Sequence, residues 1–140
     1  MIDVELLGGE LLAEGLTAGE VRRLCRLCAA RMGLRSAHVA VELVSGSRIA
    51  ELNSAHRGRP EPTDVLSFPI DGVEPIAPRN VAQAGEAPRE LGDIFICPEQ
   101  TADLREAVVH GMLHLLGMDH ERDDGEMLAL QGELLALARP

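Results

Sequence analysis

The segment VVHGMLHLLGMDH (residues 108–120) places three of the chain's five histidines in a stretch that is otherwise almost wholly apolar. We predict a helix over residues 102–116. Gly117 can take the left-handed conformation that ends a helix, so we place its end at Leu116. His110 and His114 are four residues apart, so they lie one turn apart on one face of that helix. The segment therefore predicts a largely buried helix that carries two imidazoles toward one point.

The three histidines together predict a metal site with an open position. His120 follows the expected chain reversal at Gly117 and can return to the point that His110 and His114 face. Burying three imidazoles without partners would cost on the order of 1–3 kcal/mol each, which favours ligation over a core role. Three neutral imidazoles leave one tetrahedral position open, as in catalytic zinc sites, where bound water becomes a nucleophile. Such ligands also accept nickel, cobalt or iron.

The spacing H-x-x-x-H-x-x-G-x-x-H is also that of the metzincin proteases, and it predicts a zincin-like metal helix. Those enzymes carry a glutamate general base directly after the first histidine, where this chain has Gly111. The difference argues against peptide hydrolysis, and we expect Gly111 to allow close packing of the helix against a strand. Asp119 can act as a base or can orient His120 through a hydrogen bond, and we favour the orienting role.

The rest of the chain alternates strands and helices. Thr17 and Glu20 have the spacing of a capping box, and Asp123 and Glu126 mark the start of the last helix. The sequence predicts strands over 4–7, 38–45, 64–70 and 93–97, and helices over 18–32, 47–57, 102–116 and 124–138. A loop rich in proline, glycine and alanine is expected over 71–91. This order predicts an α+β fold: a single domain over 1–140 whose small four-stranded mixed sheet packs against helices.

The composition predicts a soluble cytoplasmic protein. The chain has no run of eighteen apolar residues and no basic secretory leader. Its three cysteines are an odd number, which fits free thiols in a reducing compartment better than a disulfide framework. The formal net charge of −10 would repel a polyanion at long range, so it argues mildly against nucleic acid unless a local site overrides it.

Several polar residues are interpreted as structural on the sequence alone. Cys25 and Cys28 form a C-x-x-C pair, but no second pair follows and an apolar stripe surrounds them, so we expect core packing. His38 opens a predicted strand and has no partner in the sequence. Arg57 follows a predicted helix and precedes a Gly/Pro turn, so its side chain is available to a cleft. Most surface arginines have no special role, however, and a solvated surface charge is the commoner interpretation.

Three blocks resemble the YbeY family of bacterial rRNA maturation factors and endoribonucleases. HGMLHLLGMDH (110–120) is similar to the family signature H-G-x-L-H-L-x-G-Y-D-H. LNSAHRGRPEPTDVLSFP (52–69) resembles L-N-x-x-Y-R-x-x-x-x-P-T-D-V-L-S-F-P, and LGDIFIC (91–97) resembles L-G-D-I-x-I. The blocks follow one another in the family's order and cover about a quarter of the chain.

The resemblance implies a zinc-dependent, single-strand-specific endoribonuclease, which acts in 3′-end maturation of small-subunit (16S) ribosomal RNA and in ribosome quality control. It implies one zinc ion on His110, His114 and His120, and a catalytic Arg57 that engages RNA phosphate beside this Lewis acid. The implied partners are ribosomal RNA, the small ribosomal subunit and ribosome-assembly proteins, with no membrane. Two alternatives stay open: a non-catalytic ribosome-assembly factor with a structural zinc, and a metal-dependent hydrolase of another substrate.

Three departures from the family pattern bear on substrate contacts. His56 stands where the family has tyrosine, and Met118 replaces the tyrosine before the Asp-His pair. The stretch between Asp93 and His110 is shorter than usual by about two helical turns of roughly 5.4 Å each. We therefore expect substrate choice to be the least transferable property.

Overall fold

The computed structural model describes residues 2–11, 16–58, 61, 63–70, 89–119 and 123–138, without the side chains of Arg57 and Arg89. The strands are β1 (Ile2–Leu7), β2 (Ala37–Leu43), β3 (Val65–Pro69) and β4 (Arg89–Ile96). The helices are α1 (Ala18–Arg31), α2 (Gly46–Arg57), α4 (Leu104–Leu115) and α5 (Glu126–Leu137), with short 3-10 helices η1 (Gly9–Leu11) and η3 (Pro98–Gln100). The order of elements confirms the predicted α+β class.

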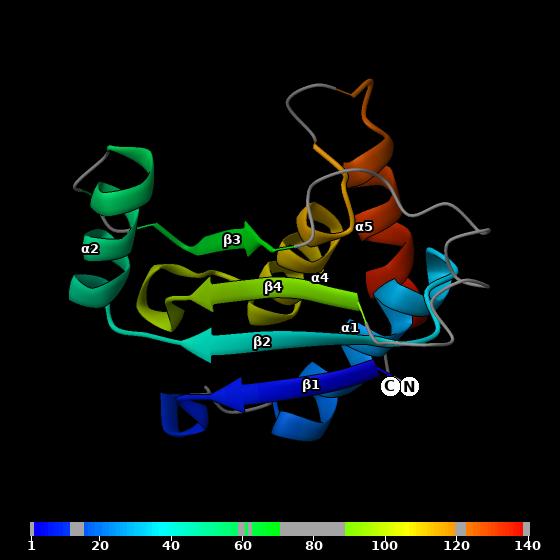
Figure 1. Cartoon of the computed structure of the whole chain (residues 1–140), viewed down its shortest axis with the longest axis horizontal. Coiled ribbons are helices and arrows are strands. Elements are labelled where there is room, and N and C mark those ends of the chain that lie inside the picture. Colours follow the sequence, from blue (N-terminus) through cyan, green and yellow to red (C-terminus); the bar gives the residue numbers. More distant parts are fainter. Residues whose placement is uncertain are drawn as a thin grey trace.

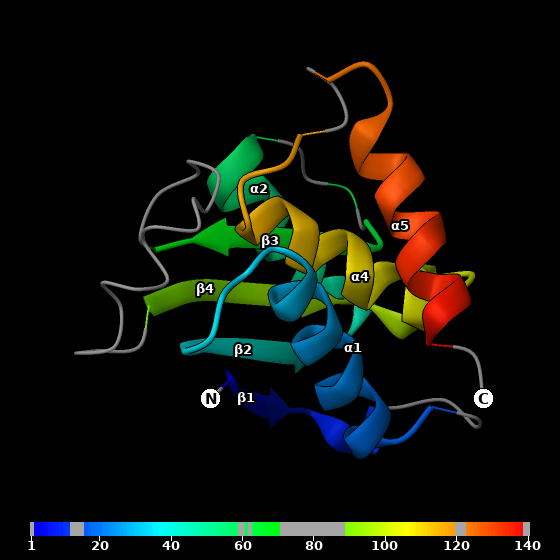
Figure 2. The ribbon, with the colours of Figure 1, turned by 90° about the vertical axis from the view of Figure 1, so that its right-hand side faces the viewer.

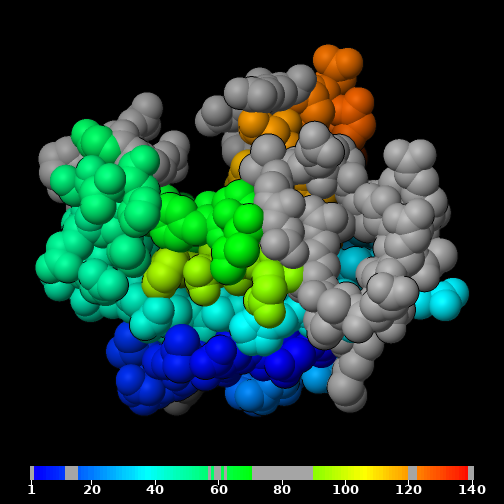
Figure 3. Space-filling model, viewed as in Figure 1, coloured from blue at the N-terminus to red at the C-terminus, as the bar shows by residue number. Residues whose placement is uncertain are grey.

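The four strands form one mixed sheet in the order β1-β2-β4-β3 (Figure 1). The central pair β2 and β4 is parallel, β1 is parallel to β2, and β3 is antiparallel to β4 at the edge of the sheet. Ala37, Val39, Val41 and Leu43 of β2 are buried in alternation, as expected for a strand with one face in the core, and Ala40 on the other face is buried as well. Helices α1 and α4 cover that face and α5 packs against α4 (Figure 2). The opposite face carries side chains of all four strands at the surface (Figure 3).

The observed element bounds agree with the predicted ones to within two residues, except at β4. This strand begins at Arg89, so the expectation that 89–91 belong to the loop is wrong. The pairing of β2 with β4 shifts register between His38 and Val39, and Gly92 has φ +133°. The strand therefore continues through a bulge, which alternating hydrophobicity does not reveal. The expected loop over 71–88 lies outside the described residues.

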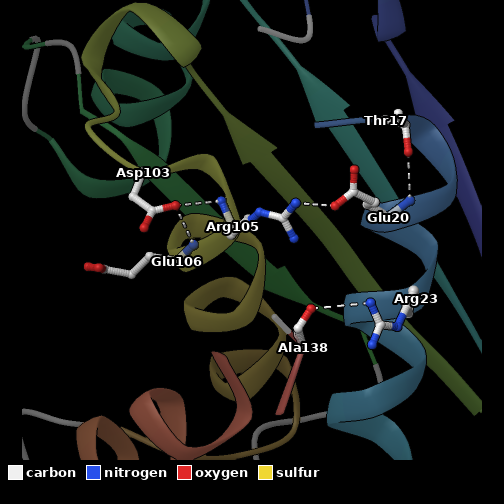
Figure 4. Close-up of polar contacts among 7 residues, drawn as sticks. All are labelled: Thr17, Glu20, Arg23, Asp103, Arg105, Glu106 and Ala138. Atoms are coloured by element: carbon white, nitrogen blue, oxygen red, sulfur yellow. Dashed lines mark hydrogen bonds and ion pairs between the residues drawn. The ribbon is translucent and has the colours of Figure 1, made fainter. Parts of the chain in front are cut away.

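Contacts at one end of α1 attach it to both other helices of its layer (Figure 4). The Thr17 hydroxyl accepts a hydrogen bond from the backbone N–H of Glu20 at 3.1 Å, as the capping prediction requires. The carboxylate of Glu20, however, pairs with Arg105 of α4. Arg23 donates to the carbonyl oxygen of Ala138, at the end of α5, at 3.2 Å. Helix α1 thus fixes α4 and α5 relative to the sheet.

Two apolar clusters hold the layers together. The larger lies between the sheet and helices α1, α4 and α5, and contains Cys25 and Cys28. All three cysteines are free and buried, which confirms the expected free thiols, and desolvation raises the pKa of the Cys28 thiol to about 12. The smaller cluster packs α2 on the β3–β4 end of the sheet through Val44, Ile49, Leu52, Leu66 and Cys97. No helix in the described part of the chain is long and apolar enough to cross a membrane.

Gly111 allows α4 to lie directly on the sheet. A Cβ atom at this position would lie 2.7 Å from Cγ2 and 3.3 Å from Cδ1 of Ile94, closer than packed carbon atoms approach. The hydroxyl of Ser67 on β3 donates to the carbonyl oxygen of Gly111 at 3.1 Å. These contacts confirm the predicted packing role of Gly111, and they fix the turn of α4 that lies between the two histidines.

Gly111→Ala is expected to destabilise the fold by about 1–3 kcal/mol, because the new methyl group must displace the branched side chain of a buried strand residue. Gly132→Ala is the matched control: Gly132 is also helical, and a Cβ there would meet nothing within 4 Å. The control should be neutral or stabilising by up to about 1 kcal/mol, since alanine favours helix. Urea unfolding measures both free energies, and equal values for the two variants would contradict the proposed contact.

His38 has partners from two neighbouring strands, which the sequence did not reveal. Its Nδ1–H donates to Oε2 of Glu90 on β4 at 2.9 Å. On β1, carboxylate oxygens of Glu5 and Asp3 lie 3.6 and 3.9 Å from Nε2. The hydrogen bond with Glu90 is the main reason why the pKa of His38 lies above its ordinary value of 6.5; desolvation opposes the rise, and the charges of Glu90, Asp3 and Glu5 add to it. The imidazolium therefore links β1, β2 and β4.

The raised pKa of His38 predicts a pH-dependent contribution to stability. A group whose folded pKa is higher than its unfolded pKa stabilises fully below the unfolded value, and this stabilisation is lost as the pH rises through the folded value. The difference in free energy of unfolding between the parent and His38→Gln should therefore be larger at about pH 5.5 than at about pH 9. Urea titrations at the two pH values measure it, and a gap that stays constant would show that the pairing adds nothing.

Candidate functional site

A pocket of about 820 Å³ lies between the sheet edge and the two C-terminal helices. Strand β3 and the residues before it contribute to its lining, as do one face of α4 from Glu106 to His114, Leu128 and Gln131 of α5, and His56 of α2. The space-filling view shows the molecule hollowed between α2 and the segment that leads to α5 (Figure 3). Residues from α2, β3, α4 and α5 therefore meet in one cavity.

His110 and His114 both line this pocket from α4 and are half-buried. Their ring centroids are 4.8 Å apart and the ring planes make an angle of 76°. The prediction that the two side chains share one face of a helix is confirmed. On the other face, Val109, Met112 and Leu113 are completely buried in the larger core. The helix is thus held by its apolar face while it presents two imidazoles to the cavity.

Helix α4 ends in the way that its glycine predicts. Gly117 has φ +98°, and its N–H donates to the carbonyl oxygen of His114 at 3.1 Å. The N–H of Met118 donates to the carbonyl oxygen of Leu113 at 3.0 Å, so the two bonds form a Schellman motif. This turn brings Asp119 back to the wall of the pocket, beside the two histidines.

Gln131 is the site residue that the sequence analysis missed. It lies on α5, has only 8% of its surface exposed, and its Oε1 is 2.8 Å from Nδ1 of His110. Because a carbonyl oxygen can only accept, Nδ1–H is the donor in this contact, and in the neutral ring Nε2 then carries the lone pair. The sequence did contain a sign of this role, because Gln131 lies on the same helix face as the apolar residues Met127 and Leu134, which are buried. A polar residue among core positions indicates a buried hydrogen bond.

The other predicted site residues are described only in part. His120 lies outside the described residues, so the convergence of three imidazoles stays a prediction. Within the described ranges, no group of three histidine, cysteine, aspartate or glutamate side chains is placed to hold a metal ion. Arg57 is the last residue of α2 and follows directly on His56, which lines the pocket.

A buried asparagine holds the chain where it leaves α2. Gly58 ends the helix with φ +69°, and Nδ2 of Asn53 donates to the carbonyl oxygen of Glu61 at 2.9 Å. Asn53 belongs to the block that resembles the YbeY family, although the sequence analysis gave it no role. Its hydrogen bond ties the last turns of α2 to the backbone at Glu61.

The described lining of the pocket is acidic. It contains four carboxylates, Asp64, Asp103, Glu106 and Asp119, and no arginine. Two of them have structural tasks: Asp64 accepts from the N–H of Val65 at 2.9 Å, and Asp103 caps α4 by accepting from the N–H groups of its first turn (Figure 4). Such a wall favours a cation over a polyanion.

Comparison with known proteins decides the family. The profile of the family described as "Endoribonuclease YbeY" matches residues 14–138. This chain belongs to that family. The resemblance found in the three sequence blocks is therefore confirmed, and the predicted class of enzyme, a hydrolase acting on RNA, is the class that the family's name denotes.

Individual YbeY relatives extend over most of the chain. The Endoribonuclease YbeY of Salinispora tropica is 45% identical over 115 residues, which are 71% of this chain and 73% of the relative. That of Mycobacterium leprae is 40% identical over 114 residues, 71% of this chain and 63% of the relative. That of Rhodococcus opacus is 37% identical over 131 residues, 83% and 72% of the two chains.

A solved structure has the same fold. The solution structure of TM1509 from Thermotoga maritima matches with a TM-score of 0.55 and 28% sequence identity. The match covers 99% of this chain and 89% of that one, so it includes the sheet and the helices on both sides of the pocket. The predicted single α+β domain is confirmed by this likeness.

Gln131→Leu should cost about 1–3 kcal/mol of unfolding free energy, because it leaves the N–H of a half-buried imidazole without its acceptor. Gln131→Glu keeps an acceptor oxygen and should retain the Nδ1–H form of His110, which ¹⁵N chemical shifts of the ring report directly. Gln100→Leu, the same change at an exposed position, is the control. An unchanged His110 spectrum in Gln131→Leu would contradict the orienting contact.

Proposed function

We propose that this YbeY family member is a zinc-dependent endoribonuclease that cuts single-stranded RNA during 3′-end maturation of small-subunit ribosomal RNA. The observation that carries the proposal is the pair His110 and His114 on one face of α4, directed into a large pocket, with His110 held in one tautomer by Gln131. The substrate and the site of action, the small ribosomal subunit in the cytoplasm, come from family membership and from the three sequence blocks.

The donor chemistry of the pocket fits a zinc ion. Proteins bind zinc through neutral imidazoles whose second ring nitrogen donates to a fixed acceptor, and His110 has this arrangement with Gln131. Carboxylates in the wall, among them Asp119, lower the cost of holding a divalent cation there. His110, His114 and His120 would be the ligands. Zinc bound there would supply a Lewis acid and an acidified water at neutral pH.

The protein's own residues have separate tasks in this proposal. Gln131 orients His110, and the Schellman turn after His114 brings Asp119 to the cavity, where a carboxylate can orient the third imidazole. Arg57, at the end of α2, would engage the phosphate from the rim of the pocket, since a guanidinium offers paired donors to phosphate oxygens. The position of the metzincin glutamate general base is occupied by Gly111, and a larger side chain there would collide with Ile94 of the sheet.

The proposal predicts different losses in two variants. His114→Ala should lose bound zinc and RNA cleavage together, because two imidazoles hold the ion more weakly than three. Arg57→Ala should keep its zinc but cut single-stranded RNA about 10²–10³-fold more slowly, as expected when one charge-stabilising donor is removed. Zinc content and cleavage of a labelled single-stranded RNA are measured on the same preparations, with His38→Gln as the control histidine outside the pocket.

The outcomes separate the alternatives. If both variants cut as fast as the parent, the cleavage comes from a contaminating nuclease and the proposal is wrong. If the parent binds one zinc ion, His114→Ala loses it and no RNA is ever cut, the chain acts as an assembly factor with a structural zinc. Retention of zinc by Arg57→Ala distinguishes a loss of phosphate contact from a collapsed site.

A further inference from the structure

The two phenylalanines of this protein lie close to His56, and Phe68 and His56 line the pocket. The chain has two phenylalanines and neither tryptophan nor tyrosine. The ring of Phe68 lies 4.5 Å from that of His56, centroid to centroid, at an angle of 46°. Phe68 also contacts Phe95 edge to face, with the ring centroids 5.5 Å apart. Three rings from α2, β3 and β4 thus form a continuous row.

The row becomes more exposed toward the pocket. Phe95 and Phe68 are half-buried and pack against the smaller apolar cluster, which fixes their position. His56 is exposed, and both His56 and Phe68 line the cavity that contains His110 and His114. Core packing explains the two phenylalanines, but it does not explain an exposed imidazole held against Phe68. Histidine and aromatic side chains are among those on which proteins stack unpaired bases.

The charge of the pocket makes such a surface important for RNA. The described lining has four carboxylates and no arginine, so it offers little attraction for phosphates beyond what Arg57 supplies. A nucleobase is uncharged and has two apolar faces, so repulsion by carboxylates affects it much less than it affects phosphate. Stacking is also available to every base in a single strand, whereas the faces of bases in a duplex are already covered.

We propose that the His56–Phe68 wall is a base-stacking subsite, which holds one nucleobase of a single-stranded RNA beside the histidine cluster. This inference rests on the proposed function and adds how the substrate is recognised. The base stacks on the imidazole of His56, and Phe68 supports that ring from behind. His56 stands where the family pattern has a tyrosine, so a planar side chain is retained although its chemistry differs.

Binding of a cleavage-resistant single strand tests the subsite apart from catalysis. The probe is a short RNA with 2′-O-methyl riboses and one 2-aminopurine, whose fluorescence falls on stacking; the protein has no tryptophan or tyrosine to interfere. His56→Ala in the metal-loaded protein should weaken binding about 5- to 150-fold, the range measured for one lost base stack. It should also restore the fluorescence of the bound probe. His56→Tyr should bind like the parent, and His38→Gln is the control.

A second probe shows whether the loss belongs to a base. For a strand that carries an abasic residue at the stacked position, the parent and His56→Ala should bind equally well. Phe68→Leu keeps most of the apolar volume and should give an intermediate loss. If His56→Ala binds the base-containing and abasic strands as the parent does, the inference is wrong, even where the nuclease activity is confirmed. Base-dependent binding without any cleavage would instead support the subsite and overturn the proposed function.

Discussion

The contact between α4 and the sheet at Gly111 is the constraint on which the site depends. With no side chain at this position, the helix backbone approaches Ile94 directly and its carbonyl oxygen accepts from Ser67 on the edge strand. His110 and His114 stand one residue before and three residues after this contact. A helix held further from the sheet would carry both imidazoles away from β3, which forms the opposite wall of the pocket. The packing of one glycine therefore sets the width of the candidate active site.

The orientation of His110 also depends on helices α5 and α1, which contribute few residues or none to the described cavity surface. Helix α5 supplies Gln131, the acceptor that decides which nitrogen of His110 is protonated. Helix α5 packs on α4, and Arg23 of α1 adds a hydrogen bond to the carbonyl oxygen of Ala138 at the end of α5. Helix α1 also pairs with α4 through Glu20 and Arg105 (Figure 4). The orientation of His110 thus relies on helices packed on one another, and the proposed zinc ligation would require that accuracy.

What the sequence predicted correctly depended on residues close together in the chain. Helical spacing placed His110 and His114 on one face, and Gly117 ends α4 because its φ of +98° is open to glycine. The features that were missed depend on pairing across the fold. Gln131 reaches His110 across 21 positions, and His38 finds Glu90 across 52. The early start of β4 follows from a bulge opposite β2, which no periodicity within β4 itself displays.

The charge of the protein restricts how it can select RNA. With 23 acidic residues against 13 basic ones, attraction to phosphate is weak outside a few arginines, and salt weakens it further. Base stacking itself releases no counterions, so its contribution to binding is less sensitive to ionic strength than that of phosphate contacts. Selection by stacking also depends on the base being unpaired, whereas selection by charge favours the denser phosphates of a duplex. If the His56–Phe68 wall stacks a base as proposed, the acidic pocket discriminates against double strands by the same feature that lets it bind single ones.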